Sequence, residues 1–123
     1  MKLNKILLRT NSKFSVVLNT WATENGYEVE DFDDKKENPE EGVDGLVIFT
    51  QNQTLDKEIS EIRDMFDHKQ KPVHKIDING TLMVGISNLD LWVERNKCKR
   101  ALFIGADNLL ENMNLVRYME HLK

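Results

Sequence analysis

Hydrophobic positions along the chain alternate between short continuous runs and stripes with helical spacing, and turn-forming residues separate them. Within each stripe the hydrophobic residues recur every three to four positions, so they mark the apolar face of a helix. The final helix is expected to begin at a capping box, with Asn108 as the cap and Glu111 three residues later. The predicted helices carry the stripes Phe14, Val17, Leu18 and Trp21; Leu55, Ile59, Ile62 and Phe66; Leu82, Ile86, Leu89 and Val93; and Leu109, Met113, Val116 and Leu122.

The continuous runs predict strands. The run from Tyr27 to Phe32 contains three carboxylates, which suits an exposed sheet edge. Residues 46–49 are all apolar, as expected for a strand covered on both faces, and we place them at the centre of the sheet. The acidic residues 33–42 predict a solvated loop, unless a short helix occupies residues 35–43. The predicted strands are residues 5–9, 27–32, 46–49, 72–78 and 101–106.

This element order predicts a three-layer α/β sandwich in a single domain over residues 1–123. Right-handed crossovers would place helices on both faces of a mostly parallel five-stranded sheet. The expected strand order is 2-1-3-4-5. Ligands of such sheets bind beyond the carboxyl ends of the strands, near the switch in strand order. That edge is expected to comprise residues 10–13, 50–56, 79–81 and 106–108.

Charge and composition exclude several classes of partner. The chain has 17 Lys and Arg against 21 Asp and Glu, a net charge of -4, which argues against nucleic-acid and anionic-membrane binding. No apolar run is long enough to cross a bilayer or to form a signal peptide. The single cysteine, Cys98, cannot form an internal disulfide. We therefore expect a soluble, cytoplasmic protein.

Two strand-to-helix loops carry groups that suit a phosphate. Residues 10–13 and Asn79–Thr81 combine hydroxyl side chains with one glycine, and backbone amides at a helix N-terminus bind anions. Neither loop matches a Walker or a dinucleotide glycine motif, so ordinary caps and turns are the alternative. The three histidines have no partners at zinc-ligand spacing, and we predict no metal site. The sequence leaves any cofactor unknown. The candidate binding residues are Thr10, Ser12, Thr50, Gly80 and Thr81.

Glu58 is the candidate catalytic residue. It lies in the first turn of the helix that follows residues 46–49, a position that faces the expected cleft. A carboxylate there would stabilise or attack the positive charge that develops at a sugar's anomeric carbon. The alternative is a surface glutamate placed favourably for the helix dipole.

A wider pattern of residues resembles a known superfamily. Asp44 introduces the strand that ends in Thr50, residues 55–62 form the next helix, and Lys71-Pro72-Val73 opens the strand after it. With the opening strand at residues 5–9 and the turn at residues 25–29, this pattern is similar to Toll/interleukin-receptor (TIR) domains and nucleoside 2-deoxyribosyltransferases. The resemblance covers about residues 5–78, and many flavodoxin-like chains share half of it. It implies a TIR-like or flavodoxin-like fold.

By that resemblance, Glu58 corresponds to the glutamate that acts on the N-ribosyl bond of NAD or a nucleoside. At two places this sequence departs from the residues that catalytic members carry, which bears on whether it is active. Leu55 and Asp56 stand where a tryptophan or cysteine often precedes that glutamate, and the first loop lacks the aromatic-rich motif. Many relatives act only by self-association, so activity does not follow from the fold.

We therefore expect a small binding or self-association module with nucleotide binding at the carboxyl ends of the strands. The alternative is an N-ribosyl hydrolase or transferase that uses Glu58 on NAD or a nucleoside. A third class is a nucleotide sensor without turnover. The expected partners are a second copy of the chain or another protein, and a nucleotide or nucleoside, with no nucleic acid and no membrane.

Overall fold

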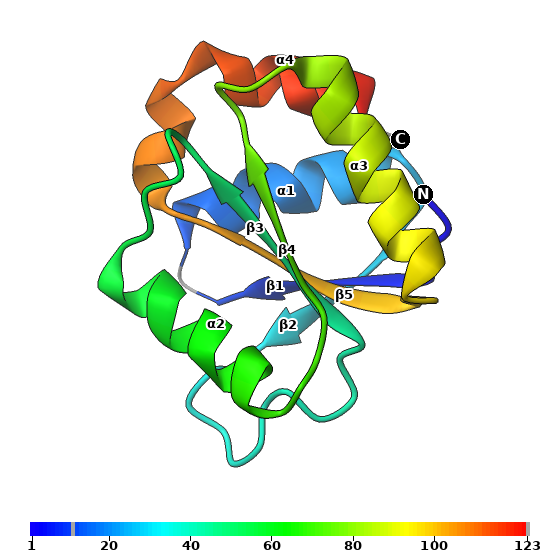
Figure 1. Cartoon of the computed structure of the whole chain (residues 1–123), viewed down its shortest axis with the longest axis vertical. Helices are drawn as coiled ribbons and strands as arrows, with labels where there is room; N and C mark the ends of the chain where they lie inside the picture. Colours follow the sequence, from blue (N-terminus) through cyan, green and yellow to red (C-terminus); the bar gives the residue numbers. More distant parts are fainter. Residues whose placement is uncertain (11, 123) are drawn as a thin grey trace.

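The computed structural model describes residues 1–10 and 12–122, and its centre is a parallel sheet of five strands (Figure 1). The strands are β1 (Lys5–Arg9), β2 (Glu28–Phe32), β3 (Gly45–Thr50), β4 (Val73–Asp77) and β5 (Arg100–Gly105). The helices are α1 (Lys13–Glu24), α2 (Lys57–His68), α3 (Leu82–Arg95), the 3-10 helix η1 (Asp107–Glu111) and α4 (Met113–His121).

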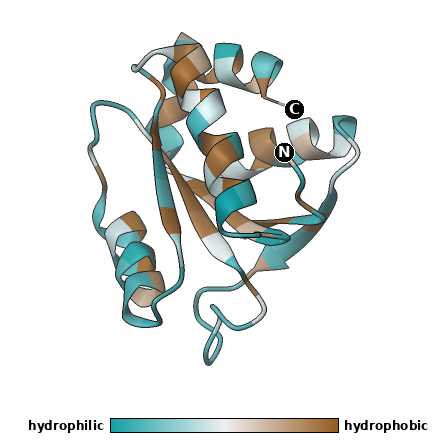
Figure 2. Cartoon of the chain, turned by 45° about the vertical axis from the view of Figure 1, so that its right-hand side comes forward, coloured by the Kyte–Doolittle hydropathy of each residue, from teal (hydrophilic) through white to brown (hydrophobic). Residues whose placement is uncertain are grey.

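The sheet lies between two layers of helices, as the sequence predicts. One hydrophobic cluster packs α1, α3 and α4 against one face of the sheet, and a second cluster packs α2 against the other face (Figure 1). Hydrophobic residues concentrate along the strands, whereas the loop between β2 and β3 is mostly hydrophilic (Figure 2). None of the helices in the described part of the chain is long and apolar enough to cross a membrane.

The strand order is β2-β1-β5-β3-β4, which corrects the expected order 2-1-3-4-5. The last strand pairs with β1 on one side and with β3 on the other, so β5 is the central strand. β3 is an interior strand beside it, every residue of which is buried. β2 is an edge strand, as its charges predict.

Asp44 holds β5 beside β3. One oxygen of its carboxylate accepts the backbone N–H groups of Lys99 and Arg100, both at 2.9 Å. The Asp44 N–H in turn donates to the Arg100 carbonyl at 2.8 Å. The chain is therefore clamped at the point where β3 and β5 both begin.

The acidic segment between β2 and β3 is a loop rather than a helix, and it reaches the α2 face of the sheet. Val43 is buried in the α2 cluster, and the Lys71 ammonium donates to its carbonyl at 2.7 Å. Glu40 is only 3% exposed, and its carboxylate lies 3.9 Å from the Lys69 ammonium. Of the two alternatives for this segment, the loop is confirmed.

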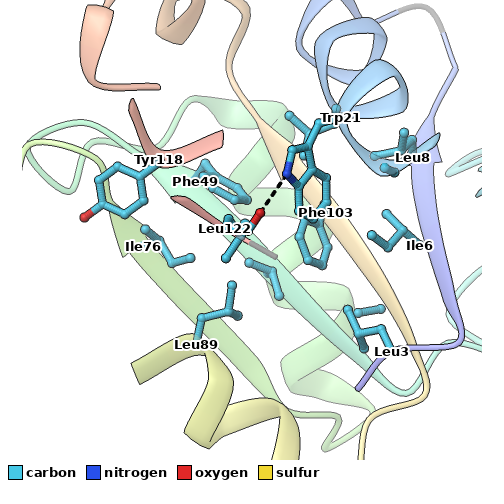
Figure 3. Packing of buried hydrophobic residues seen from close by; sticks show 14 of the residues in the cluster. Leu3, Ile6, Leu8, Trp21, Phe49, Ile76, Leu89, Phe103, Tyr118 and Leu122 are labelled. Atoms are coloured by element: carbon cyan, nitrogen blue, oxygen red, sulfur yellow. Dashed lines mark hydrogen bonds between the residues drawn. The ribbon is translucent and has the colours of Figure 1, made fainter. Parts of the chain in front are cut away.

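An aromatic cluster ties α1 and the C-terminal residues to the sheet (Figure 3). Trp21 packs against Phe103 of β5, with ring centroids 6.3 Å apart, and against Tyr27 at 5.5 Å. Its indole N–H donates to the carbonyl of Leu122 at 3.0 Å. The hydrogen bond satisfies the buried indole N–H. Both ends of the chain lie on the same side of the molecule (Figure 1).

The expected start of the last helix is wrong, and so are two of the four residues of its expected apolar face; the other two, Leu109 and Leu122, are buried as predicted. Asn108 lies inside η1, and Asn112 caps α4 by accepting the Asn114 N–H at 2.9 Å. Because the helix begins later than expected, its phase changes: Leu115 and Tyr118 are buried, whereas Met113 and Val116 are 83% and 58% exposed.

Candidate functional site

Three strand-to-helix loops meet at the carboxyl edge of the sheet. β1, β5 and β3 are neighbours, so the loops that follow them lie side by side. The crossover after β1 uses α1 on one face, and the crossover after β3 uses α2 on the other. Because these two crossovers lie on opposite faces of the sheet, their loops diverge beyond the end of β5 and leave a space there. Ligands of α/β proteins bind at this kind of position, where the direction of the crossovers changes.

Two adjoining cavities occupy this edge. We call the first the rim cleft; its volume is about 390 Å³, and it is lined by Arg9, Ser12, Asp56, Lys57, Glu58, Gly105, Ala106 and Asp107. We call the second the inner pocket; its volume is about 470 Å³, and it is lined by residues 49–52, 54–56, 59 and 106–109. The two share Asp56, Ala106 and Asp107. Their sizes are typical of small-molecule sites.

Glu58 lies at the rim cleft, where an arginine holds its carboxylate. The Glu58 Oε2 atom is 2.9 Å from the Arg9 Nη2 atom, and the same guanidinium lies 3.8 Å from the Asp34 carboxylate. The Arg9 side chain is 16% exposed, whereas the Glu58 side chain is 74% exposed. Water therefore reaches this carboxylate freely, and a catalytic role for Glu58 stays a prediction.

Asp107 lies within the expected edge, residues 106–108, but was not among the candidate site residues. Its Oδ1 atom accepts the backbone N–H of Phe14 at 3.1 Å and the Ser12 hydroxyl at 3.3 Å. Ser12 also caps α1 by accepting the Ser15 N–H at 3.3 Å. The positive end of the α1 dipole thus already faces a carboxylate of the chain itself.

The structure brings together some of the predicted binding residues. Ser12 lines the rim cleft, and Thr10 is exposed beside it. Thr50 lines the inner pocket, but it is 2% exposed and its hydroxyl donates to the Ile76 carbonyl at 3.3 Å. Asn11, part of the predicted phosphate loop, lies outside the described residues.

Gly80 and Thr81 lie apart from the rim cleft and the inner pocket, neither of which they line. They form the turn between β4 and α3, where the Gly80 N–H donates to the Asp77 carbonyl at 3.0 Å. Because β4 is the edge strand next to β3, this turn is separated from the end of β5 by the β3 loop.

A network of side-chain amides fixes the loop between β3 and α2. Asn112 donates to Asn79 at 2.8 Å and to Gln51 at 3.1 Å, and Asn79 donates to Asn52 at 3.1 Å. Asn52 and Gln53 both adopt left-handed backbone angles, with φ of 55° and 57°. The wall of the inner pocket is therefore held in one strained conformation by bonds from two other segments.

Burial keeps two titratable side chains neutral. Burial, and secondarily the charge of Asp44, raises the pKa of Cys98 to about 11, so the thiol stays protonated near neutral pH. Burial lowers the pKa of His74, whose ring lies 5.5 Å from that of Trp92. Within residues 1–10 and 12–122, no group of three or more His, Cys, Asp or Glu side chains is arranged to hold a metal ion.

Comparison with known proteins identifies the fold. No protein-family model matches the chain, and no curated protein matches its sequence. The crystal structure of a protein named "Putative molybdenum carrier protein", from Syntrophus aciditrophicus SB, is similar to this chain with a TM-score of 0.70. The two sequences are 11% identical, and the match covers 96% of this chain and 95% of that one. This likeness supports the α/β architecture and is compatible with the TIR-like resemblance, without showing membership of that superfamily.

Proposed function

We propose that this protein is a small binding module that holds a nucleoside or nucleotide at the carboxyl edge of its sheet. The observation that carries the proposal is the meeting of three loops, after β1, β5 and β3, at one cleft above the end of the central strand. The inner pocket offers apolar side chains, among them Leu55 and Leu109, to a planar base. Carboxamides at its wall, from Gln51 and Asn108, suit the polar edges of such a base.

The charges at the rim favour the nucleoside part of the ligand over its phosphates. The rim cleft contains two cations, Arg9 and Lys57, against the carboxylates of Asp56, Glu58 and Asp107. The α1 N–H group that would bind a phosphate already binds Asp107. We therefore expect binding of nucleosides to exceed binding of inorganic phosphate.

Thermal unfolding with a panel of nucleosides, nucleotides and NAD tests this proposal. A ligand at a hundredfold excess over its Kd stabilises the folded state by about 2.7 kcal/mol, on the order of a 10 °C rise in Tm for a chain of this length. Leu55→Asp should abolish the rise, because it places a charge in the inner pocket. Unchanged Tm with every compound would reject the proposal.

An N-ribosyl hydrolase is the second candidate, and the contact between Arg9 and Glu58 favours it. The guanidinium fixes one carboxylate oxygen at 2.9 Å, which orients the group at the cleft. Its exposure to water suits hydrolysis better than transfer. Incubation with NAD and nucleosides should then release the free base, and Glu58→Gln should stop the release while Glu61→Gln, on the same helix, leaves it unchanged. Binding without any product would exclude the hydrolase and leave the binding module intact.

The residues present do not fit the cargo that the structural neighbour's name implies. A molybdenum oxyanion would need free N–H donors, whereas the Phe14 N–H is bound to the Asp107 carboxylate. The described residues also lack a set of protein ligands for a metal ion.

Self-association is supported by a hydrophobic surface on α1, η1 and α4. Of the eight exposed large hydrophobic side chains among the described residues, five lie on these elements, and three of the five, Val17, Leu110 and Val116, line one hollow between them. Glu120 lines the same hollow, and Arg117 precedes it by about one turn on α4. A two-fold arrangement would pair the arginine of one copy with a carboxylate of the other, so a second copy of the chain is the proposed occupant.

Light scattering coupled to size-exclusion chromatography tests this surface. The mean mass should rise with protein concentration, and Val116→Lys should return the protein to the monomer because it introduces a charge at the contact. Val84→Lys, which changes an exposed valine on α3, is the matched control and should leave the association unchanged. A mass that stays monomeric at every concentration would contradict self-association.

A further inference from the structure

A further groove lies on the α1 face of the sheet, between α1 and the edge strand β2. Its volume is about 490 Å³. We call it the β2 groove. Leu8, Val16 and Val29 supply its apolar surface, and Ser15, Asn19 and Asp31 supply polar groups that line neither the rim cleft nor the inner pocket. The groove adjoins the rim cleft through Arg9 and Ser12, which line both, and its remaining lining residues are Thr10 and Lys13.

Secondary structure explains why these three polar side chains face one another. Ser15 and Asn19 are four residues apart in α1, so they lie on the same side of the helix. Val29 and Asp31 are two residues apart in β2, so they point to the same face of the sheet. Val29 packs against the cluster beneath α1, and this places Asp31 on the α1 side as well.

The hydrogen-bonding capacity of these groups is unused. Ser15 is 6% exposed, and its buried hydroxyl has no hydrogen-bond partner in the described chain. The Asn19 carboxamide oxygen accepts the Thr23 hydroxyl at 3.4 Å, which leaves its NH₂ group for other acceptors. Within residues 1–10 and 12–122, the Asp31 carboxylate has no ion pair or side-chain hydrogen bond. A buried hydroxyl without a partner is uncommon in folded proteins. A turn of the Ser15 side chain about its Cα–Cβ bond would bring this hydroxyl to a ligand in the groove.

We infer that the β2 groove binds the vicinal diol of a furanose sugar. The two hydroxyls of a cis-diol donate to the two oxygens of one carboxylate, which Asp31 provides. The Ser15 hydroxyl and the Asn19 NH₂ group then donate to the diol oxygens. Leu8 and Val29 contact the carbon face of the sugar ring. Arg9 and Lys13 also line the groove, so its charge alone does not select against a phosphate. The diol is selected by the paired oxygens of the Asp31 carboxylate, which accept two neighbouring hydroxyls.

The groove and the rim cleft share Arg9 and Ser12, but the diol contacts use Asp31, Ser15 and Asn19, none of which lines the rim cleft. The inference can therefore be tested independently of the proposed function of the cleft. The diol has two sources, a nucleoside and a free or glycosidic pentose. Amide NMR titration of the full chain with adenosine, 2′-deoxyadenosine, 2′,3′-dideoxyadenosine and methyl β-ribofuranoside distinguishes them. Saturable shifts at residues 15–19 and 29–31 with adenosine alone identify the nucleoside, and shifts with the riboside as well identify the sugar.

Asp31→Asn should weaken adenosine binding at the groove by about tenfold or more, because it removes the charged acceptor. Ser15→Ala should weaken it without lowering Tm, since the hydroxyl has no partner in the free protein. Glu30→Gln changes the neighbouring carboxylate, which faces Lys5 on the other side of β2, and should leave binding unchanged. Equal binding of dideoxyadenosine, no effect of Asp31→Asn, or shifts confined to residues 50–58 and 105–109 would overturn the inference. The last result would still support the proposed function of the cleft.

Discussion

Phe103→Ala should lower the free energy of unfolding by about 3–5 kcal/mol, the usual cost of deleting a buried phenylalanine. Phe103 is 0% exposed and lies on β5, the central strand. Its ring packs between Trp21 and Phe49, with centroids at 6.3 Å and 5.9 Å. The substitution leaves a cavity that neither neighbouring strand can close. Urea unfolding followed by tryptophan fluorescence measures the loss.

Phe103→Leu keeps the measurement possible if the alanine variant does not fold, and it should cost less because it keeps most of the buried volume. Met113→Ala is the surface control. Its side chain is 83% exposed, so the change in stability should stay within about 0.5 kcal/mol. Equal costs at positions 103 and 113 would contradict the central placement of β5.

Asp107→Ala should lower stability by about 1 kcal/mol, the usual cost of losing a helix cap, and create an oxyanion site that the natural chain lacks. The carboxylate is exposed to solvent and accepts the Phe14 N–H and the Ser12 hydroxyl. Its removal exposes the positive end of the α1 dipole, which then attracts phosphate, sulfate or molybdate. Thermal unfolding of both proteins, with and without these anions, measures the two effects.

The Asp107→Asn variant distinguishes the effect of losing the hydrogen-bond acceptor from the effect of losing the negative charge. Asp107→Asn keeps an oxygen acceptor for the Phe14 N–H, so it should cost less stability than alanine and gain little anion binding. The natural protein should show no specific stabilisation by the three anions. Stabilisation of the natural protein by any of the three anions would contradict the prediction that the Asp107 carboxylate occupies this site.

Local sequence predicted the elements and layers but did not predict the position of β5. The stripes of α1, α2 and α3 and the apolar run of β3 are signals within one element, and residue spacing is sufficient to recognise them. The bonds that place β5 beside β3 join Asp44 to Lys99 and Arg100, which are 55 and 56 residues away. The spacing of hydrophobic residues over the length of one helix cannot reveal a pairing between residues so far apart in the sequence.

The error in strand order also accounts for the incomplete prediction of the site. The turn with Gly80 and Thr81 was grouped with the first loop because the two segments together combine hydroxyl side chains with one glycine, and the expected order placed β4 next to the centre. With β5 at the centre, its loop, which the expected edge already included, lies between the loops after β1 and β3 and brings Asp107 to α1. Glu58 was placed correctly at the rim because it depends only on β3 and α2. Its partner Arg9 was missed, since the two are 49 residues apart.

The central position of β5 has a consequence for biosynthesis. A ribosome releases β1 to β4 before the strand that must separate β1 from β3 exists. Until residue 105 emerges, the nascent chain holds two half-sheets, each with an apolar strand whose backbone donors and acceptors lack their final neighbour. We therefore expect newly made chains to remain open to chaperones, and to mispairing, until β5 has been translated and has emerged from the ribosome.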